Sequence, residues 1–187
     1  MTKRYVIIGG SAGSFNIILQ ILENLNKNFL HPIVLILHRL KNVRYGFDEA
    51  INLKSKLPVV EPKDKDMLHS GYAYLAPANY HLLFNIDKSF VLSTEETYNH
   101  SRPSIDLAFY SAAEAFEDKA IGILLSGANR DGARGLYEMY KAGGITIVQD
   151  PEEAQVYTMP KAALNIFNPH YVLTSKEIIN FIKNLYY

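Results

Sequence analysis

Short apolar runs alternate along the chain with amphipathic stretches, and the spacing of apolar residues predicts strands and helices in turn. The runs that read as strands occupy residues 5–10, 32–37, 57–62, 71–77, 120–127 and 145–150. One helical face gathers the apolar residues that follow the first strand, namely Ile17, Ile18, Ile21, Leu22 and Leu25. Further helices are predicted around 46–56, from the N-cap candidate Ser104 to about 117, over 131–142, and near 160–165 and 175–186.

The stretch 80–93 has short apolar runs on both sides of Asp87-Lys88, which predicts a β-hairpin that turns there. Strands that alternate with helices are typical of parallel sheets. The pattern therefore predicts an α/β fold, a doubly wound and mostly parallel sheet with an inserted antiparallel hairpin. We expect one domain over residues 1–187.

Composition narrows the function classes. The 187 residues are 48% hydrophobic, which suits one domain with a full core. Lys+Arg and Asp+Glu both number 19, and this balance argues against non-specific nucleic-acid binding. With no cysteine, disulfides, thiolate nucleophiles and Cys-ligated zinc are excluded. No apolar stretch has the length of a signal-peptide core or a membrane span, so we expect a cytoplasmic protein without membrane insertion.

Gly9-Gly10-Ser11-Ala12-Gly13 lies between the first strand and the first helix. It matches G-x-S-x-G, the turn that exposes a nucleophilic serine. A dinucleotide loop, G-x-G-x-x-G, fits less well, because serines occupy its second and third glycine positions. A plain strand–helix turn is the third interpretation. All three stay open on this motif alone.

His38 follows the second strand and so lies beside Ser11 if the strands are parallel neighbours, where it could act as a general base. Asp131 follows the 120–127 strand and could orient His38, or simply cap the helix after it. Asp150 ends the next strand and competes for the same role. The spacing leaves both aspartates open, with a slight preference for Asp131.

Six blocks then resemble the catalytic domain of the chemotaxis protein-glutamate methylesterases, the CheB family. They are Ser-Ala-Gly-Ser at 11–14, His-Arg-Leu at 38–40, Ala-Pro-Ala-Asn-Tyr-His at 76–81, Arg-Pro-Ser-Ile-Asp at 102–106, Leu-Ser-Gly-Ala-Asn-Arg-Asp-Gly-Ala at 125–133 and Thr-Met-Pro-Lys-Ala-Ala at 158–163. The resemblance runs from about residue 4 to the C-terminus.

The resemblance implies an enzyme that removes methyl esters from glutamyl residues of chemoreceptor helices, and in many members also deamidates glutamine. It implies Ser11 as nucleophile, His38 as base and Asp131, rather than Asp150, as the orienting acid. No metal or organic cofactor is required. Backbone N–H groups near Ala12, Gly13 and Ala128 are expected to bind the oxyanion.

On charge alone, Arg39, Arg102 and Arg130 are candidates to face an acidic receptor helix. Most family members also carry an N-terminal receiver domain, and here the catalytic strand comes first, so we expect control to be absent or to come from a separate regulatory protein.

The sequence departs from the family pattern at Ala12, Ser14 and Ala128-Asn129. Asn129 replaces a glycine, which asparagine tolerates if the backbone is left-handed there. Two other functions remain as alternatives: a non-catalytic module that binds a protein helix, and a nucleotide-binding protein that uses the Gly9–Gly13 loop.

Overall fold

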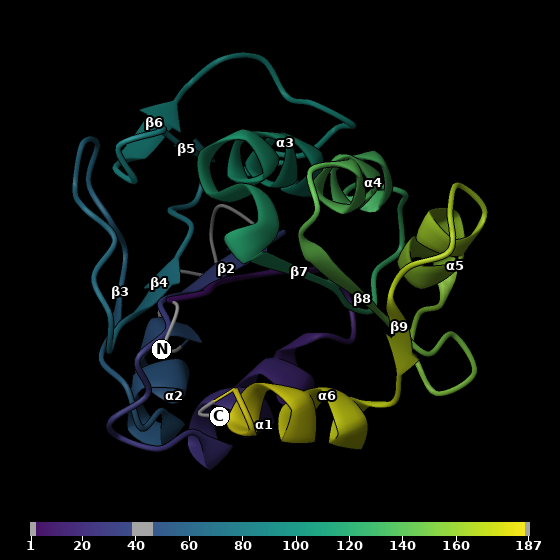
Figure 1. Cartoon of the computed structure of the whole chain (residues 1–187), viewed down its shortest axis with the longest axis horizontal. Coiled ribbons are helices and arrows are strands. Elements are labelled where there is room, and N and C mark those ends of the chain that lie inside the picture. Colours follow the sequence, from purple (N-terminus) through teal and green to yellow (C-terminus); the bar gives the residue numbers. More distant parts are fainter. Residues whose placement is uncertain (1–2, 39–46, 186–187) are drawn as a thin grey trace.

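Parallel strands form one seven-stranded sheet in the computed structural model, which describes residues 3–38 and 47–185 (Figure 1). The strand order is β3-β4-β2-β1-β7-β8-β9. These strands are β1 (Tyr5–Gly10), β2 (Ile33–Leu37), β3 (Val59–Val60), β4 (Ala73–Leu75), β7 (Ala120–Leu124), β8 (Ile145–Gln149) and β9 (Tyr171–Leu173). The chain thus proceeds from β1 toward one edge of the sheet and later from β7 toward the other.

Both faces of the sheet are covered, which explains why its central strands are apolar throughout. Along β1, Val6 and Ile8 face one core and Ile7 faces the other. In Figure 1, α1 (Phe15–Asn24), α2 (Phe47–Lys54) and α6 (Ser175–Lys183) lie below the sheet. Helices α3 (Ile105–Phe116) and α4 (Ala133–Lys141) lie above it, with α5 (Thr158–Leu164) beside α4.

The inserted hairpin pairs β5 (His81–Phe84) with β6 (Phe90–Ser93), antiparallel, as the sequence predicts. Lys88, at the predicted turn, has a φ of 70°. The hairpin packs against α3, where Phe84 contacts Phe116 with ring centroids 5.0 Å apart. A short 3₁₀ turn, η1 (Glu117–Lys119), links α3 to β7.

The fold class is confirmed, and the errors concern short elements at the sheet edges. The predicted strand 57–62 reduces to Val59–Val60, and 71–77 reduces to Ala73–Leu75. Strand β9 was not predicted, because Tyr171 and Val172 are exposed and the segment shows no buried run. Within the described ranges, no helix is both long and apolar enough to cross a membrane.

Candidate functional site

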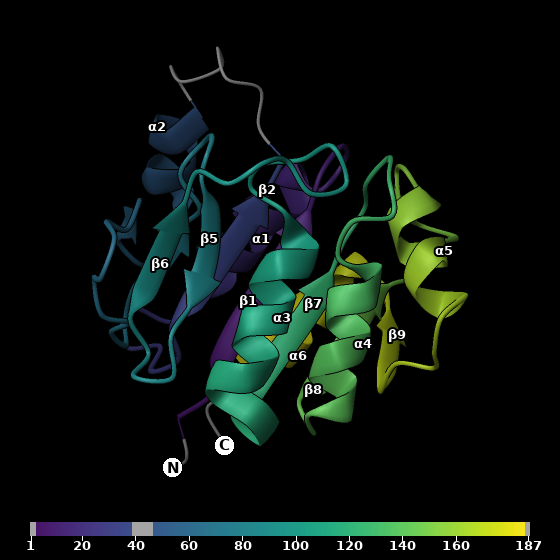
Figure 2. The same cartoon turned by 90° about the horizontal axis from the view of Figure 1, so that it is seen from above.

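Three loops meet at the carboxyl ends of β2, β1 and β7, which are neighbours in the sheet. Figure 2 shows these strands running in the same direction. Ser11 follows β1, His38 follows β2, and residues 125–132 connect β7 to α4. The strand order reverses between β1 and β7, and this switch point is where open parallel sheets bind their ligands.

The loop after β1 turns sharply into α1. Gly13 has a φ of 85°, and a side chain there would lie 2.6 Å from Ser126 Oγ, so the position needs glycine. The Ser14 hydroxyl donates to the Ser11 carbonyl at 2.7 Å and closes the turn. Ser126 Oγ donates to the Ala12 carbonyl at 2.8 Å and ties this loop to the one after β7.

This turn leaves the polar groups around Ser11 available. Among the described residues, Ser11 Oγ has no hydrogen-bond partner, and the backbone N–H groups of Ala12 and Gly13 have no acceptor. Such N–H groups at the start of a helix can bind an anion. Within the described ranges, the loop therefore offers an unpaired hydroxyl beside two unpaired donors, as an acyl-transfer site requires.

His38 and Asp131 are in contact. The His38 Nε2 atom lies 2.8 Å from Asp131 Oδ2, and the two side chains are 14% and 0% exposed. Asp150, the competing aspartate, instead accepts the Glu152 N–H through its side chain. The structure therefore brings together the His–Asp pair that the strand ends predicted.

The alternative role of Asp131, as the N-cap of α4, was wrong. Gly132 is the N-cap of that helix, and the Asp131 carboxylate faces the N-terminus of α3 instead. It accepts the backbone N–H of Ile105 at 2.7 Å and that of Asp106 at 3.0 Å. The Ser104 hydroxyl adds a third donor at 2.9 Å.

These donors keep Asp131 ionised. Burial raises the pKa of its carboxyl, but the hydrogen bonds from His38 and from the backbone of Ile105 and Asp106 outweigh it, and the pKa lies below its usual value. A carboxylate only accepts hydrogen bonds, so His38 Nε2 must carry a proton. In the neutral imidazole, Nδ1 is then the atom that can take up a proton.

Asp106 is a second buried carboxyl, which sequence reasoning did not identify as part of the site. Burial raises its pKa to about 6, and the nearby Asp131 charge adds to the effect, although the Gly135 N–H lowers it in part. The Asn99 amide joins the two aspartates, donating to Asp106 Oδ2 at 2.8 Å and to Asp131 Oδ1 at 3.3 Å. The sequence signal that could have identified Asp106 is the Arg-Pro-Ser-Ile-Asp block, which ends in this residue.

The remaining nitrogen of His38 faces a different serine. Ser101 Oγ lies 3.4 Å from His38 Nδ1, whereas Ser11 makes no hydrogen bond to His38 in the described structure. Sequence reasoning passed over Ser101, which precedes the same Arg-Pro-Ser block and belongs to a loop without periodicity.

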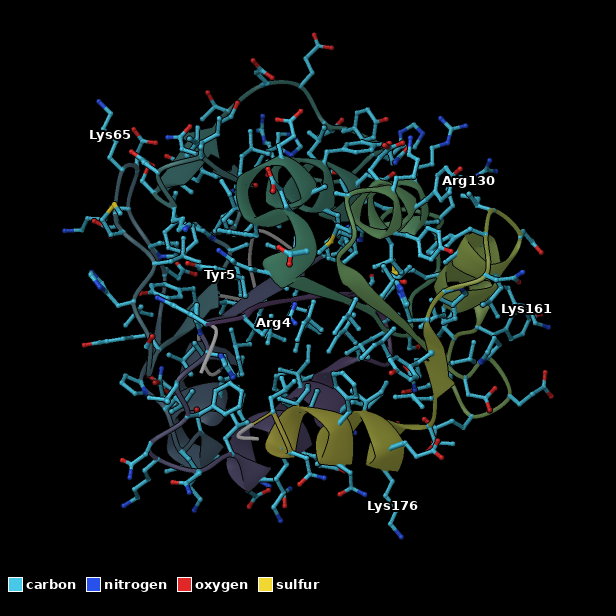
Figure 3. All side chains as sticks on the ribbon, viewed as in Figure 1. Arg4, Tyr5, Lys65, Arg130, Lys161 and Lys176 are labelled. Carbon is cyan, nitrogen blue, oxygen red and sulfur yellow. The ribbon has the colours of Figure 1, made fainter. Side chains whose placement is uncertain are left out.

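A groove of about 1000 Å³ extends from these loops to α5. Ala128 and Arg130 line it, together with Arg134 and Lys161. Figure 3 shows Arg130 and Lys161 on the same side of the molecule. The groove thus carries positive charge next to the loop that holds Asp131.

The other arginine candidates differ from Arg130. Arg102 donates through its guanidinium to the carbonyls of Thr94 and Glu95, both at 2.7 Å, and so fixes the loop before α3. Arg39 lies outside the described residues.

The backbone of Asn129 is not left-handed, since its φ is not positive, so the condition for an easy replacement of glycine is not met there. Its side chain instead accepts the Asp131 N–H at 3.0 Å. An amide that caps the loop explains why asparagine fits there without left-handed geometry.

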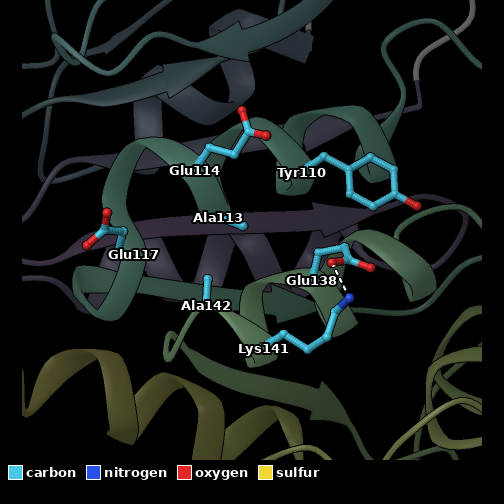
Figure 4. Close-up of a pocket in the computed structure, with 7 residues that line it drawn as sticks. All are labelled: Tyr110, Ala113, Glu114, Glu117, Glu138, Lys141 and Ala142. Atoms are coloured by element: carbon cyan, nitrogen blue, oxygen red, sulfur yellow. Dashed lines mark ion pairs between the residues drawn. The ribbon is translucent and has the colours of Figure 1, made fainter.

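A second hollow of about 560 Å³ lies between α3 and α4 (Figure 4). Glu114, Glu117 and Glu138 give it an acidic rim, and Lys141 pairs with Glu138 at 2.6 Å. It shares no lining residue with the groove, and Ser11, His38 and Asp131 do not line it. It is therefore separate from the candidate site.

Comparisons with known proteins agree on one family. The family model described as CheB methylesterase matches residues 6–182. A relative from Leptospira interrogans is 39% identical over 178 residues, which is 95% of this chain and 92% of that protein. The crystal structure of the Thermotoga maritima CheB methylesterase catalytic domain superposes with a TM-score of 0.91 at 30% identity, covering 99% of this chain and 100% of that one.

Other relatives are longer. Protein-glutamate methylesterase/protein-glutamine glutaminase 4 of Geobacter metallireducens is 35% identical over 181 residues, and the chain spans 52% of its length.

Proposed function

The chain belongs to the CheB methylesterase family, and from this premise we propose that it removes methyl esters from glutamyl residues of chemoreceptors, with Ser11, His38 and Asp131 as its catalytic triad. One observation carries the residue assignment. His38 and the buried Asp131 are 2.8 Å apart and follow the two strands that flank β1, beside a serine whose hydroxyl has no partner among the described residues.

The reaction begins when His38 Nδ1 takes the proton of the Ser11 hydroxyl, while Ser11 Oγ attacks the ester carbonyl. Asp131 holds the opposite nitrogen and stabilises the imidazolium that forms. The ester C–O bond then breaks, and the methoxide leaves as methanol with the proton from His38. Water attacks the acyl-enzyme by the same route and releases the glutamate. A glutamine side chain would react in the same way with ammonia as the leaving group.

The free N–H groups of Ala12 and Gly13 would bind the oxyanion of the tetrahedral intermediate, and Ala128, at the mouth of the groove, is the third candidate donor. Gly13 supports this role because its left-handed backbone turns the loop into α1. These interactions strengthen only as charge develops on the carbonyl oxygen, so they favour the transition state over the substrate.

The groove would hold the receptor segment. Methyl-accepting glutamates lie on helices that contain further carboxylates, and Arg130, Arg134 and Lys161 supply complementary charge. With this partner the protein would act in the cytoplasm, where receptor signalling helices lie. A separate regulatory protein remains part of the proposal, as does deamidation of receptor glutamines.

The decisive experiment measures methanol release from receptor cytoplasmic fragments that carry radiolabelled methyl esters. Wild type should release methanol, and Ser11→Ala, His38→Ala and Asp131→Asn should each lose the activity. Circular dichroism of every variant separates lost chemistry from lost folding. A folded wild-type protein that releases no methanol from intact receptor fragments would refute the proposed substrate.

A further inference from the structure

The nitrogen of His38 that must accept the nucleophile's proton is already hydrogen-bonded. Because Asp131 accepts from Nε2, the lone pair on Nδ1 is the acceptor, and the Ser101 hydroxyl, 3.4 Å away, is its donor. A single lone pair accepts one strong hydrogen bond at a time. Ser11 and Ser101 therefore require the same atom.

Ser101 is held at this position by a tight turn. Residues Tyr98 and Ser101 exchange two backbone hydrogen bonds, of 3.2 and 3.0 Å. The two residues between them, Asn99 and His100, have φ values of 50° and 61°, as in a type I′ turn.

The same turn reaches the acid. Asn99 extends from it to Asp131 Oδ1 at 3.3 Å, so one loop contacts both members of the His–Asp pair. The turn thus fixes the backbone of Ser101, from which its hydroxyl reaches His38.

We propose that Ser101 holds the base nitrogen of His38 in the substrate-free protein, and that Ser11 must displace this hydroxyl before it attacks an ester. Ser101 is a positioning residue, because it acts through His38. It keeps the imidazole in the orientation fixed by Asp131 and keeps Ser11 weakly nucleophilic until substrate enters. The proposal rests on the proposed function, since it assigns Ser101 a role in the same reaction.

The kinetic test uses a fluorophosphonate probe, which needs no receptor. Ser11 Oγ bonds to phosphorus, fluoride leaves, and the serine proton passes to His38. Ser101→Ala should label two- to fivefold faster than wild type, because Ser11 no longer competes for Nδ1. Ser101→Thr keeps the hydroxyl and should label at the wild-type rate. Ser93→Ala is the matched control. Among the described residues its hydroxyl, on β6, makes one hydrogen bond, accepted from the Glu95 N–H, and the variant should also label at the wild-type rate.

The spectroscopic test records the ¹⁵N resonance of His38 Nδ1 in the same proteins. It should move toward the value of a free lone pair in Ser101→Ala and stay in place in Ser101→Thr and Ser93→Ala. This measurement does not depend on catalysis, so the hydrogen bond can be confirmed even if receptor demethylation fails.

Equal or slower labelling of folded Ser101→Ala, or an unmoved Nδ1 resonance, would overturn the proposal. Peptide mapping after labelling identifies the modified serine. Label on Ser101 would overturn both this inference and the assignment of Ser11 as nucleophile, whereas label on Ser11 that forms faster in Ser101→Ala than in wild type would support it.

Discussion

The carboxylate of Asp131 accepts the backbone N–H of Ile105 at 2.7 Å, and this places the partner of His38 at the N-terminus of α3. Two long-range contacts, 26 and 93 residues apart in sequence, thus converge on one side chain. The partial positive charge of the helix N-terminus favours the ionised carboxylate. Asp131 therefore also stabilises the start of α3.

Asp131→Asn should lower both activity and stability. The amide retains one acceptor oxygen, but its NH₂ group faces the donors that the second carboxylate oxygen satisfied. We expect methanol release to fall by about 10³ to 10⁴. The free energy of unfolding should fall by about 1–3 kcal/mol, as measured by urea titration.

Ser104→Ala is the control for the structural part of this effect. Its hydroxyl donates to Asp131 and also caps α3 by accepting the Leu107 N–H. Its loss should cost about 1 kcal/mol of stability. Activity should fall far less than in Asp131→Asn. Equal activity losses in the two variants would contradict a chemical role for the Asp131 charge.

Ser11→Ala should abolish turnover without weakening the fold. The Ser11 hydroxyl has no hydrogen-bond partner among the described residues, so its removal leaves no buried group unsatisfied. We expect methanol release to fall at least about 1,000-fold, with an unfolding free energy within about 0.5 kcal/mol of wild type. Parallel rate and urea measurements check both expectations.

Ser14→Ala tests the neighbouring hydroxyl in the same turn. Ser14 is buried and donates to the Ser11 carbonyl at 2.7 Å. We expect a loss of about 0.5–1.5 kcal/mol in stability and a smaller loss of activity than in Ser11→Ala. Full activity in a folded Ser11→Ala protein would remove Ser11 from the mechanism.

The central strands and the strand-end residues were predictable because local pattern determines them. A buried run such as Val6–Ile8 is apolar on both faces, and parallel strands bring their carboxyl ends to one edge. That rule pointed to His38 but left Asp131 and Asp150 both open, and the resemblance to the CheB family decided for Asp131. Strand β9 could not be predicted from such a pattern, because it is three residues long and half exposed at the sheet edge.

The surroundings of the pair were not predictable, because they depend on tertiary contacts. Nothing near Asp131 in the sequence indicates that its carboxylate binds the N-terminus of α3. The residues that follow it belong to α4, so the sequence suggested a contact with α4 instead. Ser101 and Asn99 belong to a turn whose orientation is set by packing. The left-handed positions fell on Asn99 and His100 rather than on Asn129.

Asp106→Asn should change how stability depends on pH. Burial raises the pKa of Asp106 from the ordinary range of an aspartate to about 6. Its contribution to stability is therefore fully present below about pH 4 and is lost as pH rises through about 6. Asparagine does not titrate. The stability of Asp106→Asn relative to wild type should rise by roughly 2 kcal/mol between pH 4 and 7.

Urea unfolding at several pH values measures this difference. Asp131 titrates with the opposite sign, because its pKa is lowered, and its contribution is lost only as pH falls below the usual carboxyl range. The two effects therefore separate along the pH axis. A pH-independent difference between Asp106→Asn and wild type would show that the buried carboxyl does not titrate in this range.

Gly13→Ala should damage the turn that carries the oxyanion donors. The residue has a φ of 85°, and a methyl group there would lie 2.6 Å from Ser126 Oγ and 2.7 Å from Gln155 Cβ. Backbone strain and overlap should together cost about 2–4 kcal/mol of stability. Methanol release should fall as well, because the Ala12 and Gly13 N–H groups shift.

Gly71→Ala provides the matched control. Gly71 has a nearly equal φ of 80°, but nothing lies within 4 Å of a methyl group placed there. Only backbone strain of about 1 kcal/mol remains. Activity should be unchanged in this variant. If both substitutions had the same effect on activity, the fit of Gly13 against Ser126 would not matter for function.

Arg130→Glu should weaken receptor binding rather than chemistry. Arg130 is exposed, lines the groove beside Ala128, and lies on the same side of the molecule as Lys161 (Figure 3). Reversing its charge next to an acidic helix should raise KM by roughly 3- to 10-fold, leave kcat unchanged, and reduce the dependence of kcat/KM on salt.

Lys176→Glu makes the same change of charge on the exposed surface of α6, below the sheet and away from the groove. It keeps the net charge equal to that of Arg130→Glu, so any difference between the two reflects position. Initial rates over a range of receptor-fragment concentrations, at low and high salt, provide the comparison. If the two variants raised KM equally, overall charge rather than the groove would steer the receptor, and the groove would lose its role as the binding site.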